Sequence, residues 1–169
     1  MIKHKVFISH CHEDDAEVNE FVNYFCDNKE IFTPKIVGEK YDTIINSYNS
    51  DYIMRKIRED YLTDSTVTIV LIGKETYKRK YVDWEIASTL RDDKNNKRSG
   101  LLGIYLPGKS DSKIPPRLQD NIDCGYANIY PYPLHDSEKL RKWIEEAYEK
   151  RNNYYYNVDN SQELYKNNR

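Results

Sequence analysis

Apolar residues recur at two different periods along the first part of the chain, and they predict a strand followed by a helix. The run KVFIS at residues 5–9 is rich in β-branched and aromatic side chains, as is typical of a short strand. A helical pattern follows, with an apolar face made of Val18, Phe21, Val22 and Phe25. Asp14 and Glu17 have the spacing of a capping box, so we expect this helix to begin at Asp14.

Two further apolar runs predict strands of different kinds. IFTPKIV at 31–37 contains Pro34, which cannot donate a ladder hydrogen bond, so we predict an edge strand. TVTIVLI at 66–72 is almost continuously apolar or β-branched, which is typical of a strand buried on both faces in a parallel sheet. Between them, residues 38–49 predict a loop, and a four-residue repeat predicts a helix through Ile53, Ile57 and Tyr61.

The second half of the chain continues the alternation. The segment 83–91 predicts a helix, LLGIYLP at 101–107 a fourth strand followed by a polar loop, and YANIYPY at 126–132 a weaker fifth strand. The last helix is predicted to start at Asp136 or Ser137, with an apolar face of Leu140, Trp143, Ile144, Ala147 and Tyr148. Beyond Arg151 the chain is polar and rich in tyrosine, and we expect a mobile or partner-dependent tail.

Strands that alternate with helices predict an α/β fold: a five-stranded, mostly parallel sheet with helices on both faces. In the flavodoxin-like strand order 2-1-3-4-5, ligands bind at the carboxyl ends of the first and third strands. Those ends carry SHCHED at 9–14 and GKETYKRKYVDWE at 73–85. We therefore expect one pocket to bring the histidines and Glu85 together.

Composition narrows the classes of partner. The 26 basic and 28 acidic residues leave a net charge of -2, which disfavours nucleic acid as a partner. No apolar run reaches the roughly 20 residues of a membrane helix, and the opening MIKHKVFISH lacks the features of a signal peptide. The 3 cysteines include no CxxC pair, so no disulfide framework is predicted. We expect a cytoplasmic protein, built as a single domain.

The segment after the first strand offers several kinds of chemistry. No GxGxxG follows that strand and no P-loop motif occurs, so neither nucleotide cradle is present. His10, Cys11 and His12, close to Glu13 and Asp14, have zinc-ligand chemistry, but no partner set exists elsewhere and we predict no metal. The imidazole rings of His10 and His12 either cap the end of the sheet and face water or contact a ligand. A nucleophilic Cys11 is disfavoured, because neighbouring residues of an extended segment point to opposite sides.

Glu85 has two interpretations. A carboxylate in a first helical turn stabilises the helix dipole by about 0.3 to 1 kcal/mol, and on the residues alone this interpretation is favoured. Alternatively, Trp84 and the apolar strands shield the carboxylate, which then stabilises an oxocarbenium-like ribosyl cation. Cleavage to nicotinamide would need no general acid, because that leaving group departs neutral. The basic loop beside it is either solvated or neutralises a diphosphate; it contains Lys74, Lys78, Arg79 and Lys80.

Three segments carry a family resemblance: KVFISHCHEDD at 5–15, the run from Ile57 to Ile86, and GLLGIYLP with PPRLQDN within 100–121. Together they resemble the TIR and TIR-like domains, in the branch found among bacterial Thoeris antiphage-defence proteins (ThsB-like). The middle segment is the most specific, because a strand, an IG turn, a Thr-Tyr-x-Arg loop and a WEI helix start occur together. Residues 1–150 then form the TIR-like domain, and 151–169 a polar, tyrosine-rich tail outside the resemblance.

The resemblance implies a flavodoxin-like TIR fold and a hydrolase, an NAD+ glycohydrolase or ADP-ribosyl cyclase, that takes NAD+ as substrate and needs no cofactor. Its product would be a cyclic ADP-ribose variant or an ADP-ribose conjugate, made after a phage-derived trigger and sensed by a separate effector protein. The catalytic glutamate of the family falls on Glu85. The substrate-binding positions that it implies are Phe7, Ser9, His10, His12 and Trp84. Relatives often carry an aromatic residue followed by two histidines where this chain has His-Cys-His.

Two other functions stay open at this point. Many TIR domains act without catalysis by assembling with one another, and the tyrosine-rich tail suits docking or self-association. A receiver-like regulator on the same fold is a third hypothesis, since fold alone does not determine function. That hypothesis is weakened because Glu13 and Asp14 follow the first strand in the loop and form no acidic pair at its end.

Overall fold

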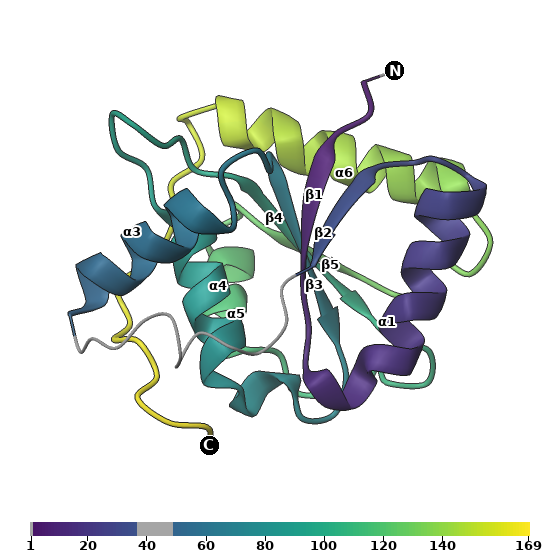
Figure 1. The fold of residues 1–169 in the computed structure, drawn as a ribbon, viewed down its shortest axis with the longest axis horizontal. Helices are drawn as coiled ribbons and strands as arrows, with labels where there is room; N and C mark the ends of the chain where they lie inside the picture. Colours follow the sequence, from purple (N-terminus) through teal and green to yellow (C-terminus); the bar gives the residue numbers. More distant parts are fainter. Residues whose placement is uncertain (1, 37–48) are drawn as a thin grey trace.

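The computed structural model describes residues 2–36 and 49–169, which form one parallel sheet between two layers of helices (Figure 1). The strand order is β2-β1-β3-β4-β5, and every neighbouring pair is parallel. The predicted five-stranded, flavodoxin-like arrangement is therefore confirmed. The strands are β1 (Lys5–Ser9), β2 (Thr33–Ile36), β3 (Val67–Ile72), β4 (Gly100–Tyr105) and β5 (Asn128–Tyr130).

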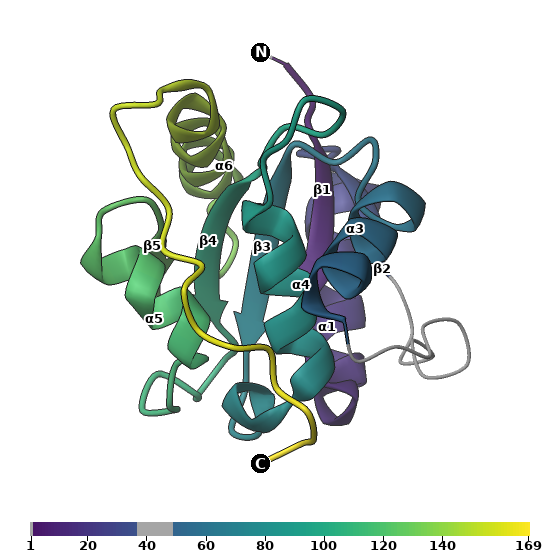
Figure 2. The same cartoon turned by 90° about the vertical axis from the view of Figure 1, so that its left-hand side faces the viewer.

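Helices cover both faces of the sheet, as Figures 1 and 2 show. One face carries α1 (Asp15–Val22) and α6 (Ser137–Asn152). The other face carries α3 (Ser50–Asp60), α4 (Lys80–Leu90) and α5 (Pro116–Asp123). The described residues also contain three short helical segments: η1 (His12–Asp14), η2 (Asn23–Asn28) and η3 (Thr76–Lys78). Among the described residues, no helix has the length and apolar character needed to cross a membrane.

The central strand explains why its sequence is continuously apolar. All residues of β3 are buried, and successive side chains enter different cores. Val67, Ile69 and Leu71 pack in the core that α1 and α6 cover, whereas Val70 and Ile72 pack in the core beneath α4 and α5. A strand with helices on both faces has no solvated side, so the alternation of apolar and polar residues disappears, as predicted.

The edge strand and the helix caps follow simple local rules. Pro34 lies in β2, the outermost of the described strands, and its missing amide is on the side of β2 that faces away from β1, as predicted for an edge strand. The Asp136 side chain accepts a hydrogen bond from the amide of Lys139 and caps α6. The predicted capping box on α1 does not form. Asp14 occupies the N-cap position without a side-chain cap, and the helix begins one residue later.

Helix α5 was not predicted, because the sequence after β4 reads as a polar loop. Its fully buried residues are Arg117, Leu118 and Asn121, and its aliphatic contacts with the core come from Leu118 and the half-buried Ile122. Two polar side chains take the remaining buried positions, and hydrophobic periodicity cannot detect such a helix. The loop predicted at 38–49 lies almost entirely outside the described residues, which resume at Asn49, the N-cap of α3.

Gly100 permits α6 to lie directly against β4. A Cβ atom at this position would contact the carbonyl oxygen of Ala147 and lie 2.6 Å from its carbonyl carbon. We expect Gly100→Ala to lower the free energy of unfolding by about 2 to 3 kcal/mol, measured by urea denaturation, because helix backbone must move. Gly103→Ala is the matched control. Its Cβ would meet the side-chain ends of Leu118 and Ile72, which can shift, so an equal loss would contradict this explanation.

Candidate active site

Glu85 lies in the second turn of α4 and not at the start of the helix, because α4 begins at Lys80. The acidic residue of the first turn is Asp83, so the helix-dipole interpretation of Glu85 does not hold. Only 5% of Glu85 is exposed, and its Oε1 accepts a hydrogen bond of 2.8 Å from the hydroxyl of Ser9. Ser9 is the last residue of β1, so the carboxylate lies at the carboxyl end of the sheet.

Hydroxyl groups fix this part of α4 to the sheet. Thr89 Oγ1 donates to the backbone oxygen of Glu85 at 2.8 Å and lies 2.8 Å from Thr68 Oγ1 on β3. Ser88 Oγ donates to the backbone oxygen of Trp84 at 2.7 Å. Burial of polar groups is costly unless they are hydrogen-bonded. The Thr68–Thr89 and Ser9–Glu85 contacts therefore join α4 to the sheet, whereas the bonds to the backbone oxygens of Trp84 and Glu85 lie within the helix.

Phe7 and Trp84 lie in an apolar cluster next to this contact. Phe7 is fully buried and Trp84 is 6% exposed, and both pack with side chains of α3 and the turn after it: Ile53, Ile57 and Leu62. The Trp84 ring also meets Tyr81 edge-on, with 5.4 Å between ring centroids. The structure thus brings Phe7, Ser9, Trp84 and Glu85 together, with the two aromatic side chains in the protein core.

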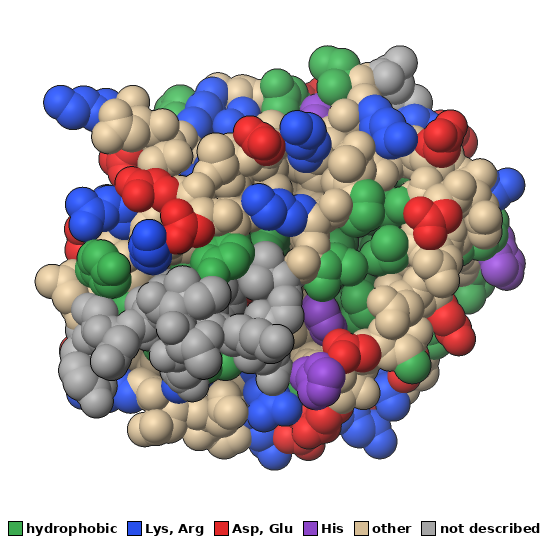
Figure 3. All heavy atoms as spheres, viewed as in Figure 1, with side chains coloured by type: hydrophobic (Ala, Val, Ile, Leu, Met, Phe, Trp, Pro, Cys, Tyr) green, Lys and Arg blue, Asp and Glu red, His purple; other side chains and the backbone are tan. Residues whose placement is uncertain are grey.

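His10 and His12 converge on one carboxylate. His10 Nε2 lies 2.8 Å from Asp15 Oδ1, and His12 Nδ1 lies 2.6 Å from Asp15 Oδ2. The His12 side chain is 70% exposed, whereas that of His10 is mostly buried. Figure 3 shows histidine and acidic side chains beside one another at this edge of the molecule. Within the part of the chain that the structure describes, no group of three or more His, Cys, Asp or Glu residues could hold a metal ion.

Cys11 has its own environment between the two histidines. Its buried thiol accepts a hydrogen bond of 3.2 Å from Arg79 Nε, and burial raises the pKa of the thiol. Arg79 also pairs with Glu13, at 3.5 Å between guanidinium and carboxylate. This side chain joins the loop before α4 to the turn after β1. The two strand-end segments selected from the sequence therefore meet in the structure.

Asp14 touches the end of β3 at Gly73. A Cβ atom on Gly73 would lie 2.6 Å from Asp14 Cγ, so only glycine leaves room for this carboxylate. Asp14 Oδ2 is buried and has no hydrogen-bond partner among the described residues. Burial raises the pKa of the Asp14 carboxyl, Glu17 and Glu13 raise it further, and Lys109 and His10 lower it.

This raised pKa predicts how Asp14 affects stability. The folded protein binds the Asp14 proton more tightly than the unfolded chain, so the ionised carboxylate destabilises the fold at neutral pH. We expect Asp14→Asn to raise the melting temperature at pH 7. The gain should shrink as the pH falls through the raised pKa and vanish below the ordinary value of 3.8. Thermal melts from pH 7 to pH 3 check this, with exposed Glu20→Gln as control; a gain that grows with acidity would contradict it.

Comparison with known proteins places this geometry in a family. Residues 7–111 match the TIR-like domain of the Thoeris protein ThsB, which is more than half of the chain. The chain belongs to the ThsB TIR-like domain family. No curated protein matches the chain. The family match confirms the resemblance seen in the sequence and gives the protein a TIR-type role in Thoeris antiphage defence. It runs from β1 to just beyond β4, so it contains Ser9 and Glu85 but ends before α5, α6 and the tail.

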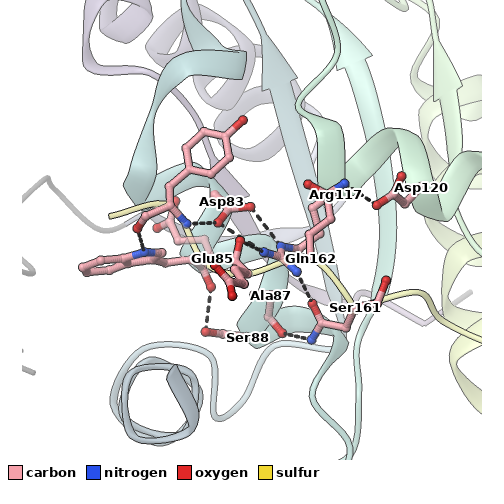
Figure 4. A network of polar contacts seen from close by, with 12 residues as sticks. Asp83, Glu85, Ala87, Ser88, Arg117, Asp120, Ser161 and Gln162 are labelled. Carbon is pink, nitrogen blue, oxygen red and sulfur yellow. Dashed lines mark hydrogen bonds and ion pairs between the residues drawn. The ribbon is translucent and has the colours of Figure 1, made fainter. Parts of the chain in front are cut away.

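In this ThsB TIR-like domain, sequence reasoning missed a polar network next to Glu85 (Figure 4). Arg117 on α5 donates from Nε to Asp83 Oδ1 at 2.9 Å, and the two side chains are 1% and 5% exposed. Asp83 Oδ2 also accepts from the backbone amide of Tyr165 at 2.9 Å. The tail expected to be mobile therefore packs against the domain. No sequence pattern links residues 34 or 82 positions apart, so nothing in the sequence indicated these contacts.

Proposed function

We propose that this TIR-like domain cleaves the N-glycosidic bond of NAD+ and transfers the ADP-ribosyl group to an acceptor. The bond between ribose C1′ and the pyridinium nitrogen breaks, and its electron pair neutralises the departing nicotinamide. A water molecule, an adenine nitrogen, a ribose hydroxyl or another small molecule then bonds to C1′ and loses a proton. The product would be a cyclic ADP-ribose variant, an ADP-ribose conjugate or free ADP-ribose.

The observation that carries this proposal is the buried Glu85 carboxylate, held by Ser9 at the carboxyl end of a parallel sheet. Ligands bind at that edge in this class of fold. A fixed negative charge stabilises positive charge that develops on the ribose ring, and shielding from water strengthens the interaction. The Ser9 hydroxyl orients the carboxylate in advance, so little reorganisation is needed during the reaction.

Other residues at the same edge have roles that follow from their placement. Phe7 and Trp84 exclude water from the α3 side of Glu85. Arg79, between the two strand-end segments, supplies the positive charge that a diphosphate requires. His10 and His12, held by Asp15, offer ring nitrogens for hydroxyl groups of the substrate. In defence, a phage-derived trigger would start the reaction and a separate effector protein would sense the product.

Mass spectrometry of small molecules from phage-infected cells tests the proposal. Cells that express the wild type should accumulate an ADP-ribosyl product and lose NAD+, whereas cells with Glu85→Gln should do neither. Equal product in both cells would contradict the role of Glu85. If the wild type forms no product but protects cells and self-associates, and Glu85→Ala does the same, the protein is an assembly module rather than an enzyme.

A further inference from the structure

The residues after α6, 153–169, form an extended segment that we call the strap. Figure 2 shows it crossing α5 and α4 to end at the start of α4, and Figure 1 shows that this is the end of the sheet to which β1 points. Hydrogen bonds hold it to the domain at several points between Asn153 and Asn168. The strap lies outside the residues that match the family, so it is a feature of this chain beyond the matched region.

Two buried arginines anchor the first part of the strap. Arg98 donates to four backbone oxygens where α6 ends and the strap begins, and its guanidinium lies 4.3 Å from the centre of the Tyr154 ring. Arg117 donates to the Asn160 side chain at 2.8 Å and to the backbone oxygen of Glu163 at 3.1 Å. The strap is thus held before it reaches α4.

The last part of the strap binds the turns of α4 that precede and include Glu85. Trp84 Nε1 donates to the backbone oxygen of Tyr165 at 2.8 Å, and the Tyr165 amide donates to Asp83. The Asn168 side chain accepts from the amide of Lys80, the first residue of α4, at 2.9 Å. Arg79 occupies the N-cap position but makes no side-chain cap hydrogen bond. Asn168 therefore caps this helix from the far end of the chain.

We propose that Asn168 is a positioning residue for Glu85, and that the strap sets the rate of the reaction by holding the first two turns of α4. This inference rests on the proposed function. Helix ends open easily when their amides lack a cap. Glu85 is only five residues from Lys80, and a displacement of about 1 Å can cost up to 100-fold in rate. Strap and sheet would then hold the carboxylate from opposite sides of the helix.

Three single variants of the full-length chain test the inference. Asn168→Ala removes the acceptor, and Asn168→Asp keeps an oxygen that can cap the helix. Asn167→Ala is the matched control, because Asn167 is exposed and no side-chain hydrogen bond of it appears among the described contacts. Asn168 is exposed as well, so none of the variants removes buried surface. Hydrogen exchange of the amides of residues 80–85 and the kinetics of nicotinamide release are measured for each.

We expect Asn168→Ala to speed exchange in residues 80–85, to leave exchange in the sheet unchanged, and to lower kcat on the order of tenfold with little change in KM. Asn168→Asp should restore both values, and Asn167→Ala should match the wild type. Unchanged exchange in Asn168→Ala would overturn the inference whether or not the protein is active. Faster exchange with unchanged kcat would overturn the positioning role. A wild type that releases no nicotinamide even with infected-cell extract would contradict the proposed function instead, and exchange would still decide whether the strap holds α4.

Discussion

Glu85→Gln is expected to lower kcat for nicotinamide release on the order of 1,000-fold in purified protein, a loss of about 4 kcal/mol in transition-state stabilisation. Glutamine has nearly the same shape, and its amide oxygen can still accept the hydrogen bond from Ser9. In the proposed reaction, the negative charge that would face the ribosyl cation is lost, while the buried contact with β1 remains. We expect KM to change little, because the cation develops only in the transition state. Chromatography of nicotinamide with NAD+ in excess measures the effect.

Two companion variants show whether charge or packing is responsible. Ser9→Ala leaves the charge but removes the group that orients it, so we expect a smaller loss, about tenfold. Glu149→Gln removes an exposed carboxylate on α6 and should leave kcat unchanged. Nicotinamide release by Glu85→Gln at the wild-type rate would contradict the assignment of Glu85 as the catalytic residue. An equal loss in the Ser9 variant would show that position matters as much as charge.

Arg117→Gln is expected to lower the free energy of unfolding by about 3 to 5 kcal/mol, because it leaves the Asp83 carboxylate buried without its ionic partner. The pair is inaccessible to water, and Arg117 also binds the strap through Asn160 and Glu163. Urea denaturation of the full-length chain measures the loss. The double variant Arg117→Gln with Asp83→Asn should recover part of the lost free energy of unfolding, because no buried charge is then without its partner.

A partly exposed ion pair, Arg141 with Glu138, is the matched control for this prediction. Arg141 lies 3.4 Å from Glu138 on α6, in a pair whose acidic partner is largely exposed. We expect Arg141→Gln to cost less than about 1 kcal/mol, because surface ion pairs are screened by water. If the two arginine variants were equally destabilising, burial of the Asp83–Arg117 pair would not explain its contribution.

Much of the fold could be predicted because local patterns and layer packing agree. The continuous apolar run of β3 requires helices on both faces, and Pro34 requires an edge, which together leave few strand orders. The segments that follow β1 and β3 were also predicted to lie side by side, and the structure brings them into contact. Ser9 and Glu85 are 76 positions apart, yet the rule for carboxyl ends of parallel strands brought their segments together.

Hydrophobic periodicity failed to predict helices, or their first residues, where polar side chains occupy the positions that face the core. Helix α5 packs two aliphatic side chains, Leu118 and the half-buried Ile122, beside buried Arg117 and Asn121, and its start was hidden among prolines and charged residues. The start of α4 was placed three residues late, because the basic loop continues into Lys80 and Arg79 at the N-cap position gives no capping signal. That difference moved Glu85 from a first turn, where the dipole explains it, to a buried second turn, where it needs another explanation.

The sequence by itself determined the α/β class, the strand order and the family, and it placed Glu85 near the strand ends. Those features depend on periodicity and on contiguous motifs. Only the tertiary structure decided that Ser9 binds Glu85, that Asp83 pairs with Arg117, and that the strap caps α4 through Asn168. Each of these contacts joins single polar residues from distant segments. A hydrogen bond between two such residues leaves no period in the sequence, because its geometry exists only after the apolar layers have packed.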